Sequence, residues 1–179
     1  MRRFLVALSA LLALAAGCTK QQTQSYYDKQ QDLIDKFVTA ANGVRTVYKG
    51  NAVRVVMKEG TTADSLAANG VISFYYGGYT LPSGTSVSAS NLFATNYKTL
   101  AESARWSTAD EESFAIKTLK LDEVPLLEGL RDGLNGVKGG EESYILFTGK
   151  YGFGNKASGT IPAKATLVYH IWVESISNE

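Results

Sequence analysis

Apolar residues follow a helical spacing near the start of the chain and a strand-like alternation over the rest. The positions with helical spacing are Tyr26, Leu33, Ile34, Phe37, Val38 and Ala41. Gly43 stands where a helix-ending glycine belongs. The spacing predicts an amphipathic helix over residues 25–43. Its apolar stripe is expected to pack on the domain, with pairing to a second copy as the alternative.

Beyond Gly43 the pattern is typical of strands. Expected strands cover residues 44–48, 52–58, 71–76, 113–119, 144–149 and 165–175. Leu126, Leu130 and Leu134 recur every four residues after Pro125, which predicts a short helix over 125–134. No repeat or linker divides the chain, so residues 44–179 are expected to form one domain. This order predicts an α+β fold with a mostly antiparallel sheet, preceded by the N-terminal helix.

Residues 1–18 are not expected to belong to this fold. Two arginines precede an apolar run, Phe4–Ala16, which is too short to span a membrane as a permanent helix. The run ends in Leu14–Cys18, a sequence that resembles a bacterial lipobox. An ordinary secretory signal with a chance cysteine is the alternative.

The lipobox resemblance implies a signal peptide over residues 1–17 and lipidation of Cys18, followed by a polar tether over 18–24. Two or three acyl chains hold a protein stably on a bilayer. Thr19 and Lys20 follow the cysteine, with no acidic run. By similarity to bacterial sorting rules, this implies an outer-membrane lipoprotein with its domain facing the periplasm.

Composition removes several classes of function. The chain of 179 residues has one cysteine and one histidine, Cys18 and His170, so it offers neither a disulfide framework nor the usual zinc ligands. Ser-His-Asp and Cys-His machinery would depend on His170 alone. The formal charge of +1 provides no basic field for nucleic acid. We therefore expect no metal, no cofactor and no nucleic-acid partner.

Several segments carry a resemblance to a known family. Leu127–Leu134 is similar to a Gly-Trp-x-x-Gly helix, Tyr151–Gly154 to a Tyr-x-Tyr-Gly loop, and Ile161–Tyr169 to an Ile-Pro-Pro-x-Ala-Thr-Leu-Val-Phe segment. Upstream, Val56–Thr61 resembles the first core strand and turn, and Tyr75–Gly77 matches a Tyr-x-Gly motif. In this order they resemble the FKBP-type peptidyl-prolyl cis-trans isomerases over residues 52–176.

The resemblance implies an antiparallel sheet wrapped around a short helix, and an apolar pocket that isomerises X–Pro bonds in polypeptides. Four residues are implied as catalytic: Tyr75, Phe153, Ile161 and Tyr169. Five more are implied to bind substrate: Phe93, Phe114, Leu126, Leu127 and Leu130. Val87 is an alternative to Phe93 as the phenylalanine of the family's Phe-Asp pair.

The chain departs from the family pattern at four places. Leu130 replaces the tryptophan floor, Phe153 replaces a tyrosine whose hydroxyl holds a substrate carbonyl, and Ala163 replaces the second proline. The aspartate of the Phe-Asp pair becomes Ala94 or Ser88, depending on the alignment. These departures leave two functions open. One is a weak prolyl isomerase that assists folding of envelope proteins, and the other is an FKBP-like module that binds polypeptides or partner proteins without turnover.

Overall fold

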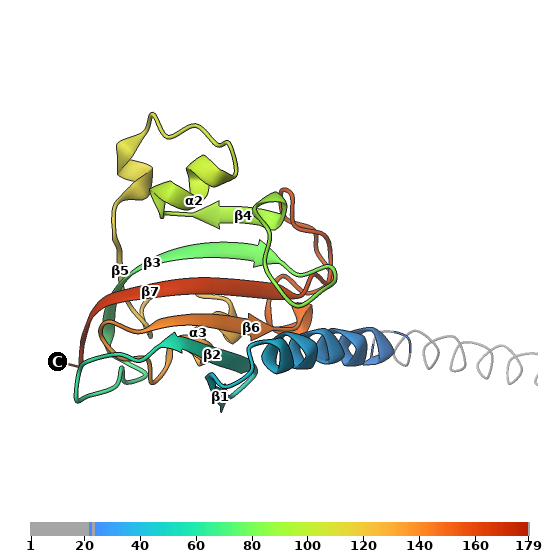
Figure 1. The fold of residues 1–179 in the computed structure, drawn as a ribbon, viewed down its shortest axis with the longest axis horizontal. Helices are drawn as coiled ribbons and strands as arrows, with labels where there is room; N and C mark the ends of the chain where they lie inside the picture. Colours follow the sequence, from blue (N-terminus) through green and yellow to red (C-terminus); the bar gives the residue numbers. More distant parts are fainter. Residues whose placement is uncertain (1–21, 23, 179) are drawn as a thin grey trace, which may run out of the picture.

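The computed structural model describes residues 22 and 24–178. The predicted signal peptide, Cys18 and most of the predicted tether lie outside these residues. The described chain forms an antiparallel sheet of seven strands in the order β1-β2-β6-β7-β3-β4, with β5 also paired to β3 (Figure 1). The strands are β1 Arg45–Lys49, β2 Ala52–Lys58, β3 Val71–Thr80, β4 Leu92–Thr95, β5 Lys117–Lys120, β6 Glu142–Phe147 and β7 Leu167–Ser177.

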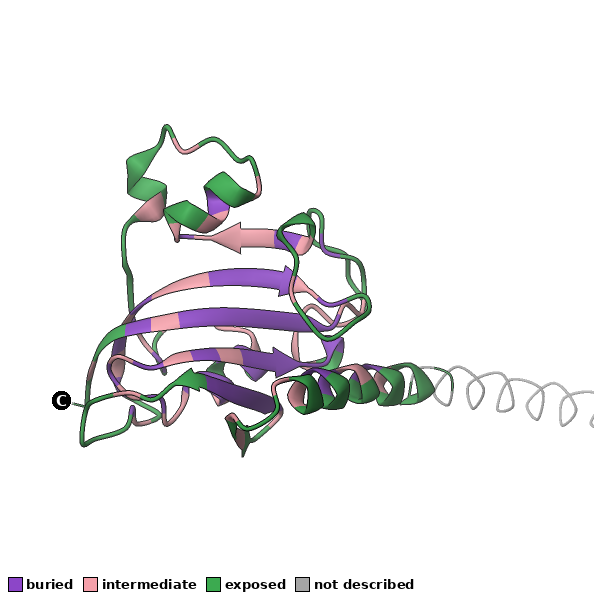
Figure 2. Ribbon diagram, viewed as in Figure 1, coloured by how far each residue is buried: buried purple, intermediate pink, exposed green. Residues whose placement is uncertain are grey.

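The alternation of β6 and β7 divides the core into two layers, because successive side chains of a strand point to opposite faces. On one face, Ile145, Tyr169 and Ile171 pack in the cluster that includes Leu130 and Leu134. On the other face, the cluster includes Leu146 and Val168 together with Ile34 and Phe37 of the N-terminal helix. Figure 2 shows the buried residues concentrated in the central strands.

Helix α3, Glu128–Leu134, covers the first face and lies unusually close to β6. A Cβ atom on Gly129 would lie 2.2 Å from Cγ of Phe147, and one on Gly133 would lie 2.1 Å from Cγ2 of Ile145. Only glycine fits at these two positions, one turn apart on the helix. The close approach places Leu130 and Leu134 in the core.

The N-terminal helix covers part of the opposite face over residues 24–40, which confirms the predicted amphipathic helix. Ile34 and Phe37 are buried against the sheet, so the apolar stripe packs on the domain. Among the described residues, no helix is both long enough and apolar enough to cross a membrane. The predicted α+β class, with an antiparallel sheet and a short helix, is also confirmed.

Some element boundaries differ from the sequence predictions. The predicted strand over 113–119 is wrong in its first half, where Glu111–Phe114 forms a 3-10 helix. There the Ser113 hydroxyl donates a hydrogen bond to Asp110 at 2.6 Å, which stabilises a turn. Strand β4 and helix α2, Lys98–Ser103, were not predicted from the sequence pattern. Helix α3 begins at Glu128 rather than at Pro125.

Candidate functional site

An apolar cavity of about 330 Å³ opens between helix α3 and the sheet. Its walls come from β3, β4, β5 and β7, from the segment before α3, and from the loop between β6 and β7. The lining residues are Phe74, Tyr76, Ala94, Lys117, Leu119, Pro125, Leu126, Leu127, Leu130, Phe153 and Tyr169. Because aliphatic and aromatic side chains dominate this surface, the cavity suits an apolar ligand group.

Aromatic packing fixes the shape of the cavity. The Tyr169 ring stacks on Phe147 with 6.0 Å between centroids, and Phe93 meets it edge-on at 5.9 Å. Tyr76 lies 6.1 Å from Tyr169, and Phe74 lies 6.0 Å from Tyr76. Such ring pairs are favourable beyond their buried area and restrict side-chain rotation. The cavity is therefore shaped before any ligand binds.

Two phenol groups and one ammonium group supply the polar chemistry of the lining. Burial raises the pKa of the Tyr169 phenol, and the neighbouring Tyr76 raises it further. Burial also raises the pKa of Tyr76. Both phenols are therefore neutral near neutral pH and can donate a hydrogen bond. Lys117 is the only charged residue of this lining.

The structure brings five of the predicted site residues together around this cavity: Leu126, Leu127, Leu130, Phe153 and Tyr169. Leu130 has 6% of its surface exposed and lines the cavity from helix α3. The catalytic and binding roles of these residues stay predictions.

Four predicted site residues do not line the cavity. Tyr75 lies on the opposite face of the sheet, where its ring is 5.7 Å from that of Tyr97. Ile161 is buried in the core cluster that also holds Leu130, and Phe93 packs against this cluster with its ring edge-on to that of Tyr169. Phe114 ends the 3-10 helix of residues 111–114 and is partly buried.

Tyr76 takes the place that the sequence analysis gave to Tyr75. Two tyrosines precede two glycines here, so the Tyr-x-Gly motif can be read as Tyr75-x-Gly77 or as Tyr76-x-Gly78. A shift of one residue moves a side chain to the other face of a strand. Alternate residues of a strand share one face, and Ile72 and Phe74 of β3 face the core below α3. The same alternation places Tyr76, and not Tyr75, on the side of the cavity.

Strand β4 bears on the two alternative alignments of the Phe-Asp pair. Ala94 pairs with Gly78 and lines the cavity, directly after Phe93. Val87 instead packs at the margin of the cluster on the opposite face. This placement favours the alignment in which Ala94 replaces the family's aspartate, which stays a prediction, and Ala94 brings no carboxylate to the cavity.

Four lining residues were not predicted from the sequence: Phe74, Lys117, Leu119 and Pro125. None of them belongs to a motif that the resemblance assigned to the site. Lys117 could have been found only by knowing that β5 pairs with β3, with Phe74 opposite Lys117. Within the described residues there is no group of three or more His, Cys, Asp or Glu side chains that could hold a metal ion.

Solved structures with similar folds define the class of this domain. A peptidyl-prolyl cis-trans isomerase from Pseudomonas syringae pv. tomato superimposes with a TM-score of 0.57 at 16% identity, covering 87% of this chain and 96% of that one. The three FKBP domains of wheat FKBP73 give a TM-score of 0.54 at 18% identity, covering 75% of this chain and 49% of that one. FkpA from Escherichia coli gives a TM-score of 0.52 at 16% identity, covering 94% of this chain and 70% of that one. At these identities the likeness shows an FKBP-like fold.

The sequence identifies the family. Residues 71–174 match the family model described as FKBP-type peptidyl-prolyl cis-trans isomerase, and the chain belongs to this family. FK506-binding protein 1 of Aspergillus oryzae is 37% identical over 46 residues. That match covers 26% of this chain and 40% of the relative, so the chain matches less than half of that protein's length.

Proposed function

We propose that this protein is a prolyl isomerase of low turnover, acting on proline-containing polypeptides during the folding of envelope proteins. The observation that carries the proposal is the cavity itself. Residues from the segment before α3, the β6–β7 loop and β7 converge there, and they include Leu127, Phe153 and Tyr169. Membership of the isomerase family supports the same function.

The chemistry requires few polar groups. Rotation about an amide bond must break its resonance and meets a barrier of about 18–20 kcal/mol. In the twisted transition state the nitrogen is pyramidal and the carbonyl is less dipolar. A dry aromatic cavity therefore favours this state over the solvated planar amide. The neutral phenols of Tyr76 and Tyr169 can donate hydrogen bonds that orient the peptide.

Two features of the cavity favour low turnover. Ala94 offers no carboxylate at the β4 wall, and Phe153 offers no hydroxyl from the loop. The same features support a second candidate function, in which the cavity grips polypeptides without turnover. Peptide binding is expected in both cases, so turnover separates them.

Restoring the loop hydroxyl tests this proposal. Phe153→Tyr should raise kcat/KM by up to about tenfold, because a hydrogen bond to the substrate contributes about 0.5–1.5 kcal/mol net. A protease-coupled assay on Ala-Leu-Pro-Phe peptides measures the rate. Phe153→Leu, which adds no hydroxyl, is the matched variant and should give no increase. Peptide binding without turnover in both the wild type and Phe153→Tyr would favour the binding module.

We also propose that Cys18 carries lipid and anchors the protein in the outer membrane, with the domain in the periplasm. The support comes from sequence alone: a short apolar run ends in Leu14–Cys18, and this cysteine is the only one in the chain. Removing residues 1–17 deletes Arg2 and Arg3, so the mature chain has a formal charge of −1. With so little net charge, lipid rather than electrostatic attraction would provide the membrane affinity.

The Cys18→Ser variant should lose its lipid. It should then either remain uncleaved or appear in the soluble fraction, whereas the wild type should partition with membranes and detergent. Fractionation and intact mass measure this, with Thr23→Ala in the predicted tether as the control. Equal fractionation and equal processing of wild type and Cys18→Ser would remove the lipoprotein proposal.

A further inference from the structure

One buried glutamine joins the N-terminal helix to the loop between β6 and β7. Gln30 has 4% of its surface exposed, although it lies on a helix that is mostly polar on its outer side. Its side-chain oxygen accepts a hydrogen bond from the backbone N–H of Gly149 at 2.8 Å. Its side-chain nitrogen donates to the backbone carbonyl of Lys164. Both ends of the carboxamide are therefore bound to main chain.

The two partners of Gln30 form the base of this loop. Gly149 follows β6 closely, and Lys164 stands shortly before β7. A Cβ atom on Gly149 would lie 2.5 Å from the carbonyl carbon of Lys164, so the two backbones touch. Lys164 also has a positive φ of 59°, an uncommon conformation for a residue other than glycine. The carboxamide of Gln30 binds both loop segments at the point where their backbones touch.

Two further hydrogen bonds connect the base of the loop to the cavity wall. The N–H of Lys164 donates to the carbonyl of Gly154 at 2.7 Å, and the N–H of Gly154 donates to the carbonyl of Gly149 at 2.8 Å. Phe153, which lines the cavity, immediately precedes Gly154. The path from the helix to Phe153 is therefore short: the side chain of Gln30 binds the backbone of Gly149 and Lys164, and backbone hydrogen bonds continue from there to Gly154.

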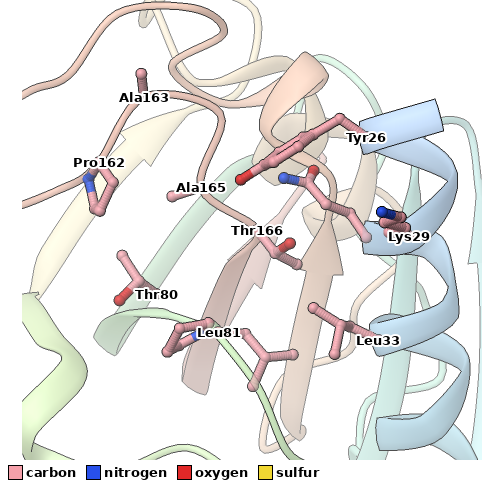
Figure 3. A pocket seen from close by; sticks show the side chains of 11 residues that line it. Tyr26, Lys29, Leu33, Thr80, Leu81, Pro162, Ala163, Ala165 and Thr166 are labelled. Atoms are coloured by element: carbon pink, nitrogen blue, oxygen red, sulfur yellow. The ribbon is translucent and has the colours of Figure 1, made fainter. Parts of the chain in front are cut away.

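Close packing does not hold the loop against the helix. Figure 3 shows Tyr26, Lys29 and Leu33 of the helix facing the loop segment Pro162–Thr166 across a second cavity, of about 300 Å³. One other polar contact crosses this space, the Lys164 ammonium 5.5 Å from the centroid of the Tyr26 ring. Because Tyr26 has 45% of its surface exposed, solvent weakens that contact. Among the described residues, the hydrogen bonds that join the N-terminal helix to this loop are therefore those of Gln30.

We propose that Gln30 is a positioning residue, which clamps the base of the β6–β7 loop and thereby fixes Phe153 in the wall of the substrate cavity. For its effect on catalysis this inference rests on the proposed isomerase function. Gln30 lies outside residues 71–174, which match the family model. The N-terminal helix is then part of the working site rather than a spacer between the tether and the domain.

Three variants test the clamp. Gln30→Met keeps the length of the side chain and removes both hydrogen bonds, whereas Gln30→Glu keeps the acceptor for Gly149 and loses the donor to Lys164. Gln31→Ala is the matched control, because Gln31 is exposed on the same helix and bonds only to Asp35, at 3.0 Å. Amide hydrogen exchange at Gly149 and Gly154 reports the loop, and kcat/KM reports the site. Hydrogen exchange and kcat/KM are measured at a temperature at which all three variants remain folded.

In Gln30→Met, the Gly149 and Gly154 amides should exchange at least about tenfold faster, and kcat/KM should fall about fivefold. Gln30→Glu should protect Gly149 more than Gln30→Met does, and Gln31→Ala should match the wild type. Wild-type exchange at both amides in Gln30→Met would overturn the clamp. Faster exchange with unchanged kcat/KM would overturn the link to the site. If the wild type neither turns over nor binds peptides, the proposed function fails, and faster exchange would still support the clamp.

Discussion

Replacing Glu141 with alanine should lower the free energy of unfolding by about 3–5 kcal/mol. The Glu141 carboxylate lies 3.1 Å from Nε of Arg54, and the two side chains are 0% and 3% exposed. This contact is electrostatic, since the geometry at Nε is not that of a hydrogen bond. Burial lowers the pKa of Arg54 while Glu141 opposes the shift, so removing Glu141 leaves a buried charge without its counter-ion.

Arg54 links this ion pair to the site. Its guanidinium donates to the carbonyls of Gly133, Asn135 and Gly136 at 2.7, 3.1 and 3.0 Å, which satisfies the C-terminal end of α3. A loss of the pair should therefore loosen the helix that carries Leu130.

Chemical denaturation of Glu141→Ala measures this effect, and an exposed pair provides the control. Arg45 and Glu59 are only 2.6 Å apart, yet their side chains are 46% and 60% exposed. Because solvent screens such a pair, Glu59→Ala should hardly move the unfolding midpoint. Equal midpoints for Glu141→Ala and Glu59→Ala would contradict the account of the buried pair.

The Leu127→Asp variant should lose about 30-fold in kcat/KM while remaining folded. Leu127 lines the cavity and is also the N-cap residue of α3, where its side chain makes no capping hydrogen bond. Aspartate is a favourable N-cap, so the fold should tolerate it. An apolar prolyl ring would then have to desolvate a carboxylate, at a cost of about 2 kcal/mol.

The conservative variant Leu127→Met separates chemistry from shape. It keeps an apolar side chain of similar volume and should stay within about threefold of the wild type. The protease-coupled assay gives the rates, and thermal unfolding verifies that both variants are folded. A fully active Leu127→Asp would place the site elsewhere on the molecule.

Long, strongly patterned segments made the fold predictable from the sequence. β2 was predicted with its observed bounds, Ala52–Lys58, because its apolar run is flanked by turn residues. The amphipathic stripe of the N-terminal helix was equally clear. β4 spans only Leu92–Thr95, too short for a pattern to show, and its place is set by pairing with β3. Around Phe114, local hydrogen bonding decided the conformation rather than alternation.

Site residues that belong to sequence motifs were predictable, whereas those placed by strand register or long-range contacts were not. Phe153, Leu127 and Tyr169 followed from the family resemblance, and the structure brings them together. The resemblance did not show whether Tyr75 or Tyr76 faces the cavity. That depends on which face of β3 packs on the core. Gln30 contacts residues more than a hundred positions away, and no local pattern reports such a partner.

The central claim is that X–Pro isomerisation takes place in the cavity below α3. NMR exchange spectroscopy on an Ala-Leu-Pro-Phe peptide tests it most directly, because cis–trans exchange is followed in the same sample as the protein amide shifts. Wild type should produce cis–trans exchange cross-peaks and shift the amides of Leu127 and Phe153, and Leu127→Asp should weaken the cross-peaks in keeping with its about 30-fold lower kcat/KM. Exchange cross-peaks of equal strength with Leu127→Asp, or peptide-induced shifts confined to the opposite face around Tyr75, would contradict the account.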